Sequence, residues 1–186
     1  MERRRQLLID HYTTELAKML SDQDFARYGM RDKIIKYSEL ANYRNINELL
    51  TEPFDYRIIL VESDYNTGHW TCIIKYKNII ESFNSYGTKP SYDFKFIPAV
   101  VRRSLGQRTN QIIELLKTKT PDQQVYYNKK QLQKINDRVN TCGRWCICRI
   151  MMAQCGYELD DFIAKLESVK RDTGKPFDII VCDWIK

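Results

Sequence analysis

The sequence lacks any long hydrophobic run. Its first apolar stretch, Leu7 to Ile9, ends at Asp10, which is too short for the core of a signal peptide. No segment approaches the roughly 18 consecutive apolar residues that a membrane helix requires. We therefore expect no membrane association, and a soluble intracellular protein whose cysteines remain reduced thiols.

Glycine and proline are scarce as well, at 7 and 5 of 186 residues. Low-complexity and disordered chains are usually richer in both, and the 43% hydrophobic content here is enough to form a buried core. The length suits one domain. We expect a single domain over residues 1–186, with a mainly helical N-terminal part at 1–50 and the remaining core at 55–186.

Charge is unbalanced toward the positive side. Lys and Arg number 30 and Asp and Glu number 24, which gives a net charge of +6. Such an excess favours anionic partners, and a contact with DNA through a basic surface is one possibility. The basic residues are scattered along the chain, and an ordinary solvated surface explains them equally well.

Apolar periodicity predicts segregated helices and short strands, and therefore the α+β class, with a small central mixed β-sheet and flanking helices. Helices are expected at 4–20, 46–50, 143–154 and 158–172, with a helical connection at 91–107. Strands are expected at 56–63, 69–76, 78–87 and 123–128. Residues 110–117 suit a strand or a helix, and 176–186 suggest a strand-like or irregular tail.

The strands at 69–76 and 78–87 have almost no linker between them, which indicates a hairpin. If the chain reverses at residues 76–78, position 69 faces roughly positions 84 to 86. His69 and Asn84 are then neighbours across two strands. Periodicity alone does not fix the register, so a direct contact between them is left open.

Three cysteines gather in the stretch VNTCGRWCIC, residues 139–148. The chain has no C-x-x-C pair and only two histidines, so we expect neither a zinc site nor any other metal. Most of the cysteines suit a buried core, where cysteine behaves as a small hydrophobe. These are Cys72, Cys146, Cys148, Cys155 and Cys182.

Cys142 differs because it follows a polar loop and precedes Gly143, where a helix is expected to begin. Free N–H groups at a helix N-terminus lower the pKa of a thiol and can hold an oxyanion. Gly143 would let the backbone approach a substrate closely. A nucleophilic cysteine also needs a base, and His69, at the start of a strand, suits this better than His11, inside the first helix. Asn84 could orient the imidazole of His69.

Four motifs in this order resemble the adenovirus-protease and Ulp1-like cysteine peptidases: GHW, FNSYG, YYNKKQLQ and NTCGRW. Within that clan they are most similar to the capsid-maturation proteases of mavirus-like virophages and Polinton elements. The resemblance covers residues 68–149. It implies the fold of that clan, with a nucleophile at the N-terminus of a buried central helix, and makes residues 1–186 a cysteine-protease domain with its catalytic core at 55–186.

The resemblance assigns Cys142 as the nucleophile, His69 as the general base and acid, and Asn84 as the residue that orients His69. A glutamine before the cysteine completes the oxyanion hole, and we choose Gln133. Relatives often carry this glutamine six or seven residues before the cysteine, whereas Gln133 lies nine before it. Asn136 and Gln131 therefore remain alternatives.

Trp70 is implied to shield the site and to bind substrate together with Gly143, although a strand aromatic in the core explains Trp70 equally well. No cofactor is expected. The function implied is an endopeptidase that cleaves capsid precursor proteins during virion maturation, as a monomer in the host's cytoplasmic virus factory and packaged in the virion. Alternatives are a Ulp1-like protease that removes ubiquitin-like modifiers, and a non-enzymatic basic module that binds nucleic acid or capsid protein.

Overall fold

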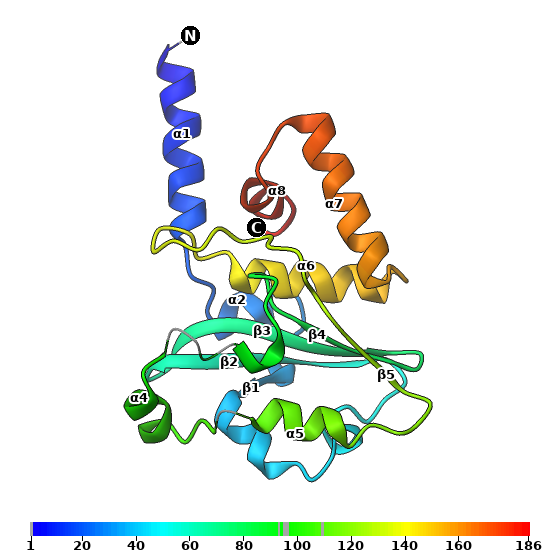
Figure 1. The fold of residues 1–186 in the computed structure, drawn as a ribbon. Helices are drawn as coiled ribbons and strands as arrows, with labels where there is room; N and C mark the ends of the chain where they lie inside the picture. The colour runs from blue at the N-terminus through cyan, green and yellow to red at the C-terminus, as the bar shows by residue number, and fades with distance from the viewer. Residues whose placement is uncertain (1, 93, 95–96, 109) are drawn as a thin grey trace.

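A five-stranded mixed sheet forms the centre of the protein (Figure 1). The structure is a computed structural model and describes residues 2–92, 94, 97–108 and 110–186, with the side chains of 2–5 and 8 excepted. The strands lie in the order β1-β2-β3-β4-β5, and the two outer pairs, β1 with β2 and β4 with β5, are parallel. The strands are β1 (Ile34–Lys36), β2 (Asp55–Asp64), β3 (Thr67–Tyr76), β4 (Ile79–Phe83) and β5 (Gln124–Tyr127).

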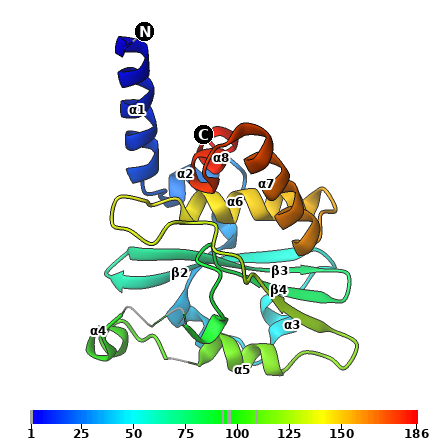
Figure 2. The same ribbon diagram turned by 45° about the horizontal axis from the view of Figure 1, so that its top comes forward.

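Helices cover both faces of this sheet (Figure 2). On one side lie α1 (Glu2–Ala17), α2 (Asp22–Ala26), α6 (Cys142–Gln154), α7 (Leu159–Thr173) and α8 (Phe177–Trp184). On the other lie α3 (Ile46–Leu49), α4 (Ala99–Ser104) and α5 (Gln111–Lys117). The 3-10 turns η1 (Arg31–Lys33), η2 (Tyr37–Asn42) and η3 (Pro90–Tyr92) complete the connections. The α+β class and the mixed sheet with flanking helices are confirmed.

Alternating side chains of the central strands enter two separate cores. On β2, Ile58 and Leu60 pack toward α6, whereas Ile59 and Val61 pack toward α3 and α5. Both faces of the sheet are therefore buried, which is why the middle of β2, from Ile58 to Val61, is apolar at successive positions rather than at every second one. Helix α6 is the most buried helix of its layer, as its apolar sequence predicts.

One prediction of secondary structure needs correction. Residues 176–186 are not a strand-like tail, because 177–184 form helix α8. Its buried residues Phe177, Ile180 and Val181 follow helical spacing and pack in the same core as α6. Residues 110–117, which suited a strand or a helix, form helix α5 at 111–117, with three buried side chains at helical spacing. Strand β1, inside the N-terminal part, was not predicted.

The predicted hairpin is confirmed. Tyr76 pairs with Ile79 across a turn in which Lys77 has a positive φ of 53°. The ladder is regular as far as Cys72 and Phe83. Continued in the same register, it brings position 69 level with position 86, within the predicted range.

One buried ion pair fastens α6 to the sheet. The Arg149 guanidinium donates from Nε and Nη2 to the two carboxylate oxygens of Glu81, both at 2.7 Å. Both side chains are completely buried. Tyr76 donates its hydroxyl to the same carboxylate at 2.7 Å, so the pair has a fixed geometry between α6 and the β3–β4 hairpin.

Removing one partner of this pair should strongly destabilise the fold. Arg149→Met would leave the Glu81 carboxylate buried without its cation, and we expect a loss of about 3 to 5 kcal/mol in the free energy of unfolding. Urea unfolding would measure it. The control is Lys77→Met, which breaks the exposed pair with Glu158 and should change stability little. Equal effects of the two variants would contradict a structural role for the buried pair.

Candidate active site

The four side chains predicted to carry chemistry line one cavity of about 400 Å³. His69 comes from β3, Asn84 from the end of β4, Gln133 from the long loop before α6, and Cys142 from the tip of α6. Residues that lie far apart in the sequence therefore meet where the hairpin passes the start of this helix.

The hydrogen bonds of Asn84 determine which nitrogen of His69 carries a proton. The main-chain N–H of Tyr86 donates to Asn84 Oδ1 at 2.9 Å, and Asn84 Nδ2 donates to Thr88 at 3.0 Å. Oδ1 is therefore the acceptor side of the amide. His69 Nε2 lies 2.9 Å from this oxygen and must be the N–H donor. Nδ1 is then the nitrogen with a free lone pair. The predicted proximity of His69 and Asn84 is confirmed.

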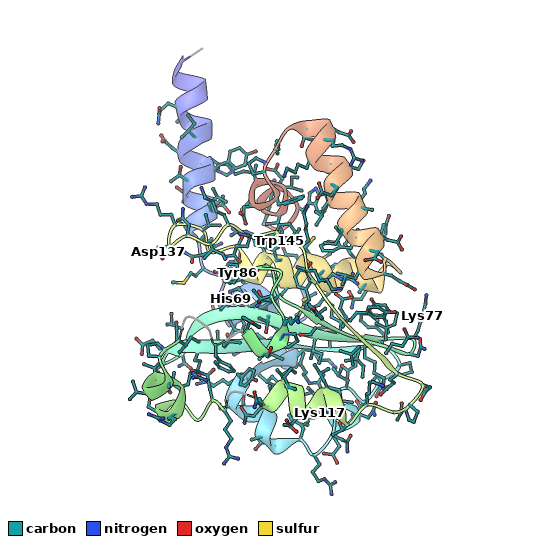
Figure 3. The ribbon with its side chains drawn as sticks, in the orientation of Figure 1. His69, Lys77, Tyr86, Lys117, Asp137 and Trp145 are labelled. Atoms are coloured by element: carbon teal, nitrogen blue, oxygen red, sulfur yellow. The ribbon has the colours of Figure 1, made fainter. Side chains whose placement is uncertain are left out.

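Tyr86 is a residue of the site that the sequence analysis missed. Its ring stacks on the His69 imidazole with centroids 4.3 Å apart and planes 6° from parallel, and Figure 3 shows the two side by side. Burial raises the pKa of Tyr86 to about 12, with further contributions from Cys142, Asp178 and Asp137. The ring is therefore neutral and holds the imidazole plane. The hairpin register, which places position 86 opposite 69, was the signal that could have identified it.

Burial also sets the protonation state of the imidazole. It lowers the pKa of His69 to about 4, and the hydrogen bond with Asn84 offsets only part of that effect. Asn84 contributes an oriented dipole but no negative charge, so it stabilises the imidazolium less than a carboxylate would. At neutral pH His69 is a neutral imidazole, which is the form that can accept a proton.

Cys142 begins helix α6, as predicted, but its thiol is not activated in the resting protein. Burial raises the pKa of Cys142, and backbone hydrogen bonds from Trp70, Gly143 and Cys142 itself counteract it only in part. The N–H groups at the helix tip therefore lower the pKa of Cys142 as expected, but burial outweighs them. Both the thiol and the imidazole are neutral at pH 7. No hydrogen bond joins them in the described part of the chain.

The side chain of Asp178, on α8, holds the N-terminal tip of α6 in place. This buried carboxylate accepts hydrogen bonds from the Thr141 hydroxyl, the Lys134 main-chain N–H and Trp145 Nε1. Thr141 is the N-cap residue of α6, and Lys134 follows Gln133. One side chain of α8 thus connects the residue before Cys142 with the residue after Gln133.

Of the three candidates, Gln133 is the one that both lines the cavity and is buried. It is buried, and its Oε1 accepts from the Ser85 hydroxyl at 2.8 Å, which leaves Nε2 as the donor. Nε2 donates one hydrogen to the Val139 carbonyl at 2.8 Å and carries a second. Gln131 lies outside the cavity lining, whereas Asn136 lines the cavity from an exposed position.

Trp70 and Gly143 have structural contacts in addition to their position near Cys142. The Trp70 indole packs edge-on against Phe25, with centroids 4.9 Å apart, and its Nε1 donates to the Leu20 carbonyl at 3.0 Å. A Cβ at Gly143 would come within 2.9 Å of Leu20 Cβ. Gly143 therefore lets the chain before α2 pack on the helix tip.

A second cavity of about 410 Å³ reaches Cys142 from the other side. Trp70 and Leu20 line it, and it shares Gly68, Asn140 and Cys142 with the first cavity. At Gly68 a side chain is impossible, because its Cβ would lie 2.0 Å from the Val61 carbonyl oxygen. Cys142 thus lies at the junction of two cavities.

The described residues contain no cluster of three or more His, Cys, Asp or Glu side chains that could hold a metal ion. All six cysteines are free thiols. In the same part of the chain, no helix combines the length and the apolar character needed to cross a bilayer.

These features define an α+β protein with a thiol, an imidazole and two amides gathered at a helix tip. No family model matches the chain. The uncharacterized protein V9 of Sputnik virophage is 35% identical over 133 residues, which is 70% of this chain and 74% of V9. The chain belongs to the same family as this virophage protein.

The depressed pKa of His69 should make the fold sensitive to acid. The folded protein keeps His69 neutral down to about pH 4, whereas the unfolded chain binds a proton near pH 6.5. The contribution of His69 to the free energy of unfolding is fully present above about pH 6.5 and is lost as the pH falls to about 4. His69→Gln should therefore lose less stability than the parent over this window, measured by urea unfolding at several pH values.

The exposed His11 on α1 provides the matched control. His11→Gln removes one histidine without touching the cavity and should keep the parent's acid sensitivity. If His69→Gln showed the same decline as the parent, the burial of a neutral imidazole would be wrong.

Proposed function

We propose that the protein is a cysteine endopeptidase that cleaves capsid precursor proteins during maturation of a virophage. The observation that carries this proposal is the hydrogen bond of His69 to Asn84 Oδ1, which directs Nδ1 to be the base in a cavity that also contains Cys142 and Gln133. A structural histidine would also need a hydrogen-bond acceptor, so the support comes from the oriented amide and the stacked ring occurring in one cavity with a thiol at a helix tip.

The chemistry starts from the neutral pair. When the substrate binds, His69 Nδ1 accepts the Cys142 proton and the sulfur attacks the scissile carbonyl carbon. The negative oxygen of the tetrahedral intermediate is held by Gln133 Nε2 and the backbone N–H at Cys142. His69 then gives its proton to the leaving amine. Water attacks the thioester with His69 as base, which releases the acid product and restores the thiol.

The two cavities favour cleavage within a chain. An endopeptidase must hold residues on both sides of the scissile bond, and the two hollows meet at Gly68, Asn140 and Cys142. Since His69 protonates the leaving amine, the part of the substrate after the cut lies in the first cavity and the acyl part lies beside Trp70. Virophage membership supports a viral structural protein as the substrate, with action in infected host cytoplasm and in the virion.

Cys142→Ala should abolish cleavage of the virophage major capsid protein or its precursor while the fold remains intact. The matched control is Cys146→Ala, which removes a buried thiol one turn further along the same helix and should retain activity. Gel analysis of the capsid protein after incubation, together with thermal unfolding, measures both effects. Cleavage by Cys142→Ala would refute the mechanism. Cleavage of ubiquitin-like fusions, but not of capsid protein, would indicate that the substrates are proteins carrying ubiquitin-like modifiers.

Gln133→Ala should lower kcat by about 10²-fold or more, because one donor to the oxyanion is lost. Gln131→Ala is the control, since this glutamine lies two residues away and outside the cavity lining. Steady-state kinetics on a peptide spanning the cut site would compare them. A normal kcat for Gln133→Ala would indicate that Asn136, rather than Gln133, supplies the side-chain donor to the oxyanion.

A further inference from the structure

The C-terminal end of α1 is capped by residues beside the nucleophile. The last carbonyls of a helix have no partners within the helix and must find others. Leu16 O accepts from the main-chain N–H of Asn140 at 2.7 Å, and Ala17 O accepts from Asn140 Nδ2 at 2.9 Å. Asn140 lies two residues before Cys142 and lines both cavities.

Arg144, two residues after Cys142, caps the same end of the helix. Its Nη1 donates to the carbonyls of Glu15 at 2.9 Å and Lys18 at 3.3 Å, and its Nη2 pairs with the Glu15 carboxylate at 2.6 Å. Arg144 is almost completely buried. A buried guanidinium needs such partners. If α1 moved away from the tip of α6, the Arg144 charge would be left without them and the folded state would be destabilised.

The segment after α1 continues along the nucleophile. Leu20 accepts the indole N–H of Trp70 and packs on Gly143. Residues 15–20 therefore contact the chain before Cys142, the chain after it, and the strand that carries His69. The outer part of α1, in contrast, projects away from the body (Figure 1).

We propose that α1 is a positioning element for the nucleophile, and that Asn140 and Arg144 are positioning residues that act through it; this rests on the proposed function of the same site. When residues 15–20 are docked, Asn140 and Arg144 hold Cys142 from both sides in the orientation that faces His69 and Gln133. When they are released, the tip of α6 loses that orientation and the thiol becomes more accessible.

The test compares two contacts made by one helix. Asn140→Ala removes the cap donated by its side chain to Ala17. Tyr12→Phe removes the bond from the Tyr12 hydroxyl to Asp183 at 3.1 Å, which ties α1 to α8 and not to the site. Both variants are measured by thermal unfolding, by kcat and KM on a capsid peptide, and by the rate at which iodoacetamide alkylates Cys142, read by mass spectrometry.

For Asn140→Ala we expect kcat to fall about 10-fold or more, because the reacting groups are misplaced, with a smaller change in KM from the loss of its side chain in the cavity lining. Alkylation of Cys142 should become several-fold faster. Tyr12→Phe should leave both rates near the parent values. If Asn140→Ala does not fold, Asn140→Ser, which keeps one donor, replaces it with the same expectation in weaker form.

Equal changes in the two variants, or no change in alkylation for the Asn140 variants, would overturn the positioning role. Alkylation does not depend on peptidase activity, so it tests the positioning role even if the parent protein cleaves no peptide. An inactive parent refutes the proposed function alone.

Discussion

The buried ion pair between Arg149 and Glu81 is the constraint on which the rest of the structure depends. It joins the central helix to the middle of the sheet at a place without solvent, where an unpaired charge would be very unfavourable. Arg149 lies two helical turns after Cys142, and Glu81 lies three residues before Asn84. The ion pair fixes the rotation of α6 relative to the position of β4. The Cys142 thiol and the Asn84 side-chain amide therefore line the same cavity.

With this frame in place, the site keeps its reactive groups uncharged. Burial raises the pKa of Cys142 and lowers the pKa of His69 to about 4, and Asn84 supplies no charge to reverse either effect. Tyr86 and Asn84 hold the imidazole by stacking and hydrogen bonding instead. Such a site is pre-oriented but not pre-ionised, so in the proposed mechanism the proton passes from the Cys142 sulfur to His69 only when a substrate binds.

Local sequence predicted much of this arrangement. The hairpin turn and the buried helix follow from strand length and continuous apolar composition, and they were enough to bring His69 near Asn84 and to place Cys142 at a helix start. The tail at 176–186 was misread because a short apolar run suits a strand or a helix equally until its packing partner is known. The hydrogen bonds of Asn140 to the end of α1, and those of Asp178 to the tip of α6, join segments more than 30 residues apart. A local sequence pattern cannot predict such contacts.

The two ends of the chain converge on α6, the helix that begins at Cys142. Arg144 holds the C-terminal end of α1 and also donates from Nε to the carbonyl of Ile185 at 3.1 Å. The first helix and the last residues are therefore both in place only when the tip of α6 is complete. The contact of Arg144 with Glu15 spans 129 residues of sequence and the contact with Ile185 spans 41, so both require the closure of long loops. The orientation of Cys142 is thus coupled to completion of the fold as a whole.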